Sequence, residues 1–393
     1  MKKLLIINAL ASLLLMQSCK KDGTLSSGTS EPLSGETSQS ITKAWMDQPI
    51  TTSAWVDQTV TNFFKRTTGS VAFDQGSSIP LSDGRVLWVT QDAYYQGSLS
   101  GNYLYCNHTI AYSNSIIIQP TKTNWSSAAP MMTRTGAVNN IGNMIPKQPG
   151  TTWTWPGAGV EIGNYVYIYA AEGNGLNPTN QALYKLTKST GTAWNTAPVR
   201  ITPNNMSGQV EALYSAGMVK EADGYVYCFG QKGTNFGYNS EVYVARFHQS
   251  NPSVWTYWDG FVWNTNRCTC AVTTSLASNS VAKVNGKYVL CTITSGYNCD
   301  GNRGVYTSFS SSPTGPWSPR KLVYTINETF NDGRIRYYTP IIHPESTAGG
   351  LLITYCVNFG ACGQAECTGT GATRDPNFYR PRGITVPLSE IGI

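Results

Sequence analysis

Three acidic residues could carry out acid–base chemistry, because each stands at a regular distance from a β-turn dipeptide. Asp74 lies nine residues before Asp83-Gly84, Asp92 nine residues after Asp83, and Glu211 twelve residues before Asp223-Gly224. Glycoside hydrolysis needs one ionised carboxylate as base or nucleophile and a second, of raised pKa, that protonates the leaving oxygen. We predict Asp74 as general base, Glu211 as general acid and Asp92 as the group that orients them. The alternative is that all three are turn caps or solvated loop acids.

Residues that could bind a sugar fall near the same end of the chain's predicted strands. Trp153, Trp155 and Tyr338 offer flat surfaces for stacking on sugar rings, although an aromatic residue in a β protein can equally well be core. Arg336 could bind an acidic sugar or pair with Asp332. By the same count, Glu172 lies near this end and Glu161 near the opposite one, which excludes Glu161 from the predicted catalytic group.

Two further candidates are expected deeper along the same axis. Asn279 and His343 both stand six residues before a predicted turn. Most residues at this depth, such as Ser77 and Gly217, are small, so His343 is expected to project into a narrow space. It is a candidate substrate ligand with an ion or water beside it, or else a hydrogen-bonded structural histidine. No cofactor or structural metal is expected, because the chain has only three histidines.

The elements that would position these residues recur five times. A turn dipeptide precedes a dense apolar strand at intervals of 80, 60, 62 and 64 residues, and such dipeptides close tight hairpins. The turns are Asp83-Gly84, Gly163-Asn164, Asp223-Gly224, Asn285-Gly286 and Gly349-Gly350. A short strand precedes each turn, and a third strand follows each hairpin; in the first unit the third strand is predicted at 109–113. The pattern predicts an all-β fold, a five-bladed β-propeller of antiparallel four-stranded blades over 59–393. The alternative is a pair of β-sandwich domains.

The composition and the N-terminus predict where the protein works. Its 393 residues include only 13% charged residues and carry a net charge of +6 without a long basic run, so no nucleic-acid partner is expected. Lys2 and Lys3 precede an apolar stretch that ends at Cys19, which predicts a lipoprotein signal peptide at 1–18 with Cys19 lipidated. Residues 19–58 are expected to tether the domain to a bacterial cell envelope, as an outer-membrane lipoprotein on the periplasmic or the outer surface. The alternative is an ordinary secretory signal with an incidental cysteine.

The remaining cysteines divide into two groups. Cys228, Cys291 and Cys356 fall within second strands and are expected to be small buried residues. The others fall in connections near the predicted site, and in an oxidising compartment they favour disulfides over zinc. They are Cys106, Cys268, Cys270, Cys299, Cys362 and Cys367. We predict a local bridge between Cys362 and Cys367, and a second from Cys268 or Cys270 to Cys299.

Several of these segments, in order, resemble the secreted propellers known as domains of unknown function 4185 and 5005. The segments are Asp74-Gln75-Gly76, 80–88, Gln91-Asp92, Ser280-Val281, Gly286-Lys287-Tyr288, 315–318, His343-Pro344-Glu345, Tyr355 and Asn358. The resemblance runs over residues 60–390, with one departure at Gln91-Asp92-Ala93, where Gly-Asp-Thr is usual. Those families are similar to the furanosidase propellers of glycoside hydrolase family 43, in which a last-blade histidine sits near a central ion or water. The resemblance implies cleavage of a furanose-rich polysaccharide such as arabinan, with inversion favoured.

These observations lead to one main hypothesis and two alternatives. The main hypothesis is a lipid-anchored, exported glycoside hydrolase whose partner is a polysaccharide or oligosaccharide and whose contact with the membrane is its anchor. The first alternative is a surface lipoprotein that binds glycans without cleaving them. The second is a structural role in an envelope complex. Convergence of Asp74, Asp92 and Glu211 would favour the enzyme over the binding protein.

Overall fold

The computed structural model describes residues 52–393, with gaps at 108–109, 128–130, 134–142, 192–193, 195, 268–269, 331, 347–348 and 364–371, and with the backbone alone for 131–133. The predicted signal peptide, Cys19 and most of the predicted tether lie outside the described residues. Among the described helices, none has the length and apolar character that a membrane crossing requires. The fold is all-β, as predicted, and the described part of the chain contains only two short α-helices, α1 (Gln58–Phe63) and α2 (Leu388–Ile391).

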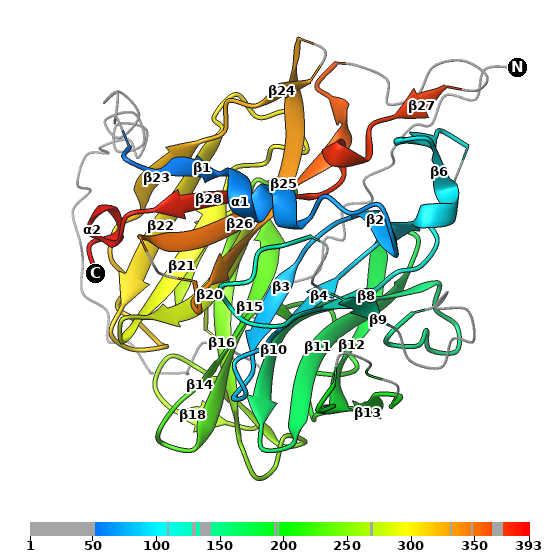
Figure 1. Ribbon diagram of the computed structural model, residues 1–393. Coiled ribbons are helices and arrows are strands. Elements are labelled where there is room, and N and C mark those ends of the chain that lie inside the picture. Colours follow the sequence, from blue (N-terminus) through cyan, green and yellow to red (C-terminus); the bar gives the residue numbers. More distant parts are fainter. Residues whose placement is uncertain are drawn as a thin grey trace, which may run out of the picture. The chain divides into compact units, whose positions relative to one another are not determined.

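Five antiparallel sheets follow one another along the chain, and each contains a hairpin of two strands that are neighbours in the sequence (Figure 1). The first contains β3 (Ser77–Pro80), β4 (Val86–Thr90), β8 (Ser115–Gln119) and β9 (Met131–Thr133). The second contains β10 (Trp153–Ile162), β11 (Tyr165–Asn174), β12 (Asn177–Thr187) and β13 (Val199–Ile201). The third contains β14 (Leu213–Lys220), β15 (Tyr225–Thr234), β16 (Asn239–His248), β17 (Trp255–Trp258), β18 (Trp263–Asn264) and, paired with β16, β19 (Thr273–Leu276).

The last two sheets complete the series. The fourth contains β20 (Ser278–Val284), β21 (Lys287–Ile293), β22 (Gly304–Ser310) and β23 (Lys321–Thr325). The fifth contains β24 (Thr329–Phe330), β25 (Gly333–His343), β26 (Leu351–Ala361), β28 (Pro381–Val386) and β1 (Trp55–Asp57). Smaller pairings join β2 (Ser70–Phe73) to β5 (Ala93–Tyr95), and β7 (Tyr103–Tyr105) to β6 (Leu99–Ser100) and β27 (Thr373–Arg374). Single turns of 3-10 helix occur at η1 (Gln96–Ser98), η2 (Asn235–Gly237) and η3 (Pro376–Phe378).

All five predicted turns are confirmed as hairpin connections between the first two long strands of a sheet. Backbone conformation explains the residue types there. Gly84, Gly163, Gly224 and Gly286 have φ between 59° and 89°, a region that side chains with a Cβ rarely adopt. The turn dipeptides are therefore dictated by local sterics, which is why the sequence alone locates them.

One predicted strand is wrong. The third strand of the first sheet is β8 at Ser115–Gln119, where three isoleucines pair with β4, and not 109–113. Before β8 the backbone pairs with Ala93 of β5 instead of β4: Ala93 N donates to the carbonyl oxygen of Tyr112, and Ala111 N donates to that of Ala93. Ser113 N then donates to Asn143 Oδ1. A single bridge to another strand therefore replaces the predicted ladder.

The innermost strands β3, β10, β14, β20 and β25 contact one another in chain order, and β25 also contacts β3. Five apolar clusters fill the spaces between neighbouring sheets. They join the first sheet to the second, the second to the third, the third to the fourth, the fourth to the fifth, and the fifth with α1 to the first. Residues 50–393 form one unit by their contacts, which argues against the alternative of two sandwich domains. In Figure 1 the blue β1 lies beside the red β28, and the two are antiparallel partners.

Candidate active site

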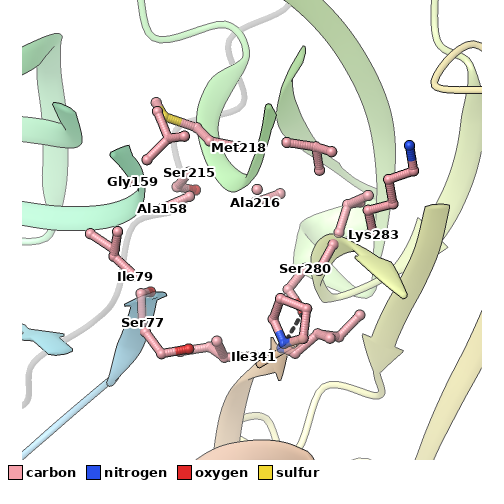
Figure 2. A pocket seen from close by; sticks show the side chains of 18 of the residues that line it. Ser77, Ile79, Ala158, Gly159, Ser215, Ala216, Met218, Ser280, Lys283 and Ile341 are labelled. Carbon is pink, nitrogen blue, oxygen red and sulfur yellow. Dashed lines mark hydrogen bonds between the residues drawn. The ribbon is translucent and has the colours of Figure 1, made fainter. Parts of the chain in front are cut away.

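A pocket of about 500 Å³ lies between the innermost strands of the five sheets. Figure 2 shows Ser77, Ala158, Ser215 and Ser280 from different sheets around this space. The strands approach closely because small residues face the axis. A Cβ placed on Gly217 would lie 2.0 Å from the carbonyl oxygen of Val281. The close approach of the innermost strands therefore requires small residues at the axis. The polar groups that could take part in chemistry lie at the two ends of the pocket.

Asp74 and Asp92 come together beside Gln75, which lines this pocket, although neither aspartate lines it. The two segments are joined as backbone partners: Asp74 N donates to the carbonyl oxygen of Asp92 at 3.2 Å, and Gln91 N donates to that of Asp74 at 2.9 Å. Asp74 precedes β3 and Asp92 follows β4, so the hairpin that connects these strands brings the two residues back to the same level. The proximity predicted from the turn count is confirmed for this pair.

Burial makes both carboxyl groups weak acids, and a neighbouring charge adds to the effect on Asp74. Desolvation, followed by the neighbouring charge of Asp92, raises the pKa of Asp74 well above its usual range. Desolvation also raises the pKa of Asp92 to about 6, opposed by the hydrogen bond from Trp155. Two acids that interact in this way titrate as a pair. At mildly acidic pH the pair can hold one proton and one negative charge.

Two tyrosine hydroxyl groups hold Asp74 in place. Tyr338 donates to Oδ2 of Asp74 at 3.0 Å, and Tyr379 donates to the same atom at 3.3 Å. The other oxygen, Oδ1, is buried and has no hydrogen-bond partner among the described residues. Tyr338 is on β25, as the turn count suggested. Tyr379 follows η3 and was missed, because no periodic pattern connects this loop residue to the site.

The predicted tryptophans form a stacked pair beside Asp92. Trp153 and Trp155 lie with ring centroids 3.7 Å apart and planes within 11°. Trp155 is partly exposed and donates from Nε1 to Oδ1 of Asp92 at 2.8 Å. Trp153 is buried and donates to the carbonyl oxygen of Gly175. Trp155 is thus the member of the pair with a surface open to a ligand, while Trp153 supports it from behind.

The structure does not bring Glu211 into this group. Its side chain is 68% exposed, with Oε1 3.4 Å from Nη2 of Arg267. Glu172, at the same end, is buried and bound by Arg200 through two hydrogen bonds of 2.7 and 2.8 Å, so its role is structural. Glu161 lines the other end of the pocket, where it accepts hydrogen bonds from Ser82 and Lys188, as expected for a non-catalytic residue.

The remaining predicted ligands occupy different environments. Asn279 lines the central pocket and donates to Gln231 and Ser275, while its Oδ1 is buried without a partner in the described part of the chain. Arg336 lies over the exposed ring of Tyr297, which packs edge-on against Tyr338.

His343 is fully buried and does not line the pocket. Its ring nitrogens are 2.7 Å from Ser78 Oγ and 2.8 Å from Thr354 Oγ1, and burial lowers its pKa to about 3. These contacts are those of a neutral, hydrogen-bonded histidine. No three His, Cys, Asp or Glu side chains converge into a metal-binding group within the described ranges.

A disulfide is present near the site, but its pairing differs from the prediction. Cys299, after β21, is bonded to Cys362, after β26, with Cα atoms 5.7 Å apart. This bridge excludes both predicted pairings, because each required one of these cysteines. Cys106 is also disulfide-bonded and Cys270 is a free thiol, whereas Cys268 and Cys367 lie outside the described residues. The predicted burial of Cys228, Cys291 and Cys356 is confirmed. The spacing of cysteines along the chain could not predict this pairing, because the bridge joins the fourth sheet to the fifth across 63 positions.

Among solved structures, a putative hydrolase from Bacteroides ovatus is similar at 18% identity and a TM-score of 0.66, over 85% of this chain and 90% of that one. A GH43_1 enzyme from Xanthomonas citri has 11% identity and a TM-score of 0.47, over 86% of this chain and 91% of that one. An endo-arabinase from Bacteroides thetaiotaomicron has 10% identity and a TM-score of 0.44, over 81% of this chain and 96% of that one. The first likeness shows a shared fold, and the two weaker ones carry no further conclusion.

No protein with a curated function matches this sequence. One family model matches residues 57–387, from β1 through β28 and so through all five sheets. Because this match covers most of the chain, the protein belongs to the family described as Domain of unknown function (DUF5005).

Proposed function

We propose that the protein is a glycoside hydrolase that acts on an extracellular, furanose-rich polysaccharide such as arabinan. The observation that carries this proposal is the adjacent carboxyl pair of Asp74 and Asp92, with raised pKa values, beside Gln75 of the central pocket. Hydrolysis of a glycosidic bond needs a carboxylate that activates the attacking water, and a raised pKa makes that carboxylate a stronger base; a separate carboxyl group protonates the leaving oxygen. The partly exposed ring of Trp155 beside the pair offers a stacking surface for a sugar.

In the proposed reaction the pair handles the attacking side. In its ionised form Asp74 takes the proton from the attacking water, and its raised pKa makes it a stronger base for this step. Asp92 orients it and contributes to the raised pKa through its charge. Tyr338 and Tyr379 fix the carboxyl plane of Asp74 from one side. Glu211 remains the proposed general acid, and its exposed position leaves it free to meet the leaving oxygen of a long substrate. A water-mediated attack would invert the anomeric configuration.

We further propose that the five sheets are the blades of a closed five-bladed propeller. The contacts of β25 with both β20 and β3, and the pairing of β1 with β28, support ring closure. We also retain the proposal that Cys19 is lipidated and holds the domain on the outer membrane of a bacterial cell. An enzyme for large extracellular polymers would gain from such an anchor, because it keeps the site beside the cell that takes up the products.

A glycan-binding protein without catalysis is the second candidate, and the exposed position of Glu211 favours it. Here Asp74 and Asp92 would accept hydrogen bonds from sugar hydroxyl groups, and no proton would be transferred. Both proposals predict binding, so only product formation separates them.

The test is a screen of the chain that starts after Cys19 against arabinans and other plant and microbial glycans. We expect new reducing ends from a furanose-rich polymer. We also expect Asp74→Asn to lower the rate by at least about a hundredfold, since acid–base groups contribute that much. Circular dichroism of the variant checks that the fold is intact. Binding of a polymer without release of any product would reject the enzyme and support the binding protein.

A further inference from the structure

A second pocket, of about 430 Å³, lies where the hairpin end of the fifth sheet meets the connection that follows β8. Its lining includes the turn between β25 and β26 on one side and Lys122, Thr123 and Trp125 on the other. Asp74 and Asp92 stand at the other ends of β3 and β4, so this pocket is separate from the candidate active site. Asp57 at the end of β1 also lines it, which places the pocket at the junction of the first and last sheets.

Glu345 is the unusual residue of this pocket. Its side chain is only 5% exposed, and neither carboxylate oxygen has a hydrogen-bond partner among the described residues. The hydroxyl of the adjacent Ser346 is likewise buried without a partner there. A buried carboxylate without compensation is strongly unfavourable, so proteins pair such groups or use them to bind cations.

The neighbours of Glu345 compensate its charge only in part, because burial raises its pKa to about 7 and outweighs the hydroxyl of Ser78 and the charge of Lys122, which lower it. Nδ1 of His343 lies 4.0 Å from Oε1, beyond hydrogen-bond distance, and its short contact is with Ser78 instead. Lys122 lines the pocket, but no ion pair joins it to Glu345 within the described part of the chain. Asp57 lines the same space and already accepts one hydrogen bond at each oxygen, from Val60 N and Thr385 Oγ1. When Glu345 is ionised, Asp57 and Glu345 against Lys122 give the lining an excess of one negative charge.

We propose that this pocket binds a hard divalent cation, of the calcium or magnesium class, through Glu345. Carboxylate and hydroxyl oxygens are the ligands that such ions prefer, and Ser346 and Thr59 supply hydroxyl groups in the same lining. An ion held by few carboxylates keeps much of its water. Six water molecules occupy roughly 180 Å³ of liquid volume, which this pocket can hold. His343 is not a ligand, because both of its nitrogens are already engaged.

The consequence of such a site is structural. The cation would connect the turn after β25 to the connection that follows β8, and so would join the last sheet to the first. It would therefore stabilise the folded chain by mass action and would leave the candidate active site unchanged. The proposal is independent of the activity, and its test needs no substrate.

The probe is Tb³⁺, a luminescent substitute for Ca²⁺, added to the full chain after treatment with a chelator. Trp125 lines the pocket and should sensitise the emission on excitation of tryptophan. We expect saturable emission that Ca²⁺ displaces, and a rise in Tm when Ca²⁺ or Mg²⁺ is restored. Glu345→Gln, which keeps the shape of the side chain, should weaken Tb³⁺ binding at least about tenfold and abolish the rise in Tm.

Glu390→Gln is the matched control, because Glu390 is paired with Lys321 outside the pocket and its loss should leave Tb³⁺ binding unchanged. Trp125→Phe should lose the emission but keep the rise in Tm. If the wild-type chain gives neither saturable emission nor a rise in Tm, the pocket holds only water and the proposal is rejected, whether or not Glu345→Gln folds. Equal Tb³⁺ affinity in Glu345→Gln and the wild-type chain would also reject it.

Discussion

At the scale of single residues, Asp74 and Asp92 owe their properties to each other and to their burial. An isolated surface aspartate is ionised at neutral pH and is a poor proton donor. Here desolvation acts on both groups, and the charge of Asp92 adds to the effect on Asp74. The hydrogen bond from Trp155 lowers the pKa of Asp92, and those from Tyr338 and Tyr379 lower the pKa of Asp74, because each stabilises the charged form. These effects are smaller than the desolvation that raises both pKa values.

The raised pKa of Asp92 predicts how stability depends on pH. Its pKa is raised in the folded chain from 3.8 to about 6, so between these values the folded state binds the proton more tightly than the unfolded state. The resulting stabilisation is complete below pH 3.8 and is lost as the pH rises through 6. We expect the free energy of unfolding to fall over this window by on the order of 1–3 kcal/mol from this group. Urea denaturation at a series of pH values measures it.

The Asp92→Asn variant supplies the comparison. It lacks the titrating group, so the decline between pH 4 and pH 7 should be shallower than in the wild-type chain. Asp332→Asn, at an exposed position, is the control and should follow the wild-type curve. Identical pH dependence in the wild-type chain and in Asp92→Asn would show that the folded state does not raise this pKa.

At the scale of elements, the innermost strands must approach one another closely. In Gly217→Ala the new Cβ would meet the backbone oxygen of Val281, which belongs to the neighbouring β20 and cannot rotate away. We expect a loss of about 3 kcal/mol or more in the free energy of unfolding, the upper range for overpacking. Gly233→Ala on β15 is the control, because a Cβ there meets nothing within 4 Å. Thermal unfolding of the two variants measures the difference. Similar Tm values would contradict the close approach of Gly217 to the backbone of Val281.

The disulfide between Cys299 and Cys362 is a second link between elements. It closes a segment of 63 residues across the fourth and fifth sheets, and a bridge of this kind contributes about 2 to 4 kcal/mol. We expect Cys299→Ser to lose that amount in chemical denaturation under non-reducing conditions. Cys270→Ser, which removes an exposed free thiol, should change little. Equal stability of the two variants would contradict a contribution from the bridge.

At the scale of the whole molecule, the first described strand completes the last sheet. β1 pairs with β28, and Asp57 caps α1 by accepting a hydrogen bond from Val60 N. A chain that starts at residue 59 should therefore be less stable than one that starts at residue 50, by more than about 1 kcal/mol, the value of the cap alone. Differential scanning calorimetry of the two chains tests this. Equal Tm values would mean that β1 adds nothing to the closure of the fold.

Much of the architecture could be predicted from the chain because its signals are local. Positive φ at Gly84 or Gly286 is a property of a few neighbouring atoms, and it recurs at every hairpin. Alternation and turn counting then placed Asp74 beside Asp92. The same method failed at 109–113, because Ala111 and Tyr112 pair with Ala93 of β5 and Ser113 N donates to Asn143, 30 positions away, where a ladder with β4 was expected.

The β class, the five hairpins and the level at which Asp74 and Asp92 lie are encoded locally in the chain, since each follows from steric rules over a few residues. The contact of Tyr379 with Asp74 and the bond between Cys299 and Cys362 depend on how the sheets pack. So do the exposure of Glu211 to solvent and the burial of Glu345 in a second pocket. These outcomes depend on contacts between sheets, where burial changes the free energy of a charge by far more than any neighbour in the chain does.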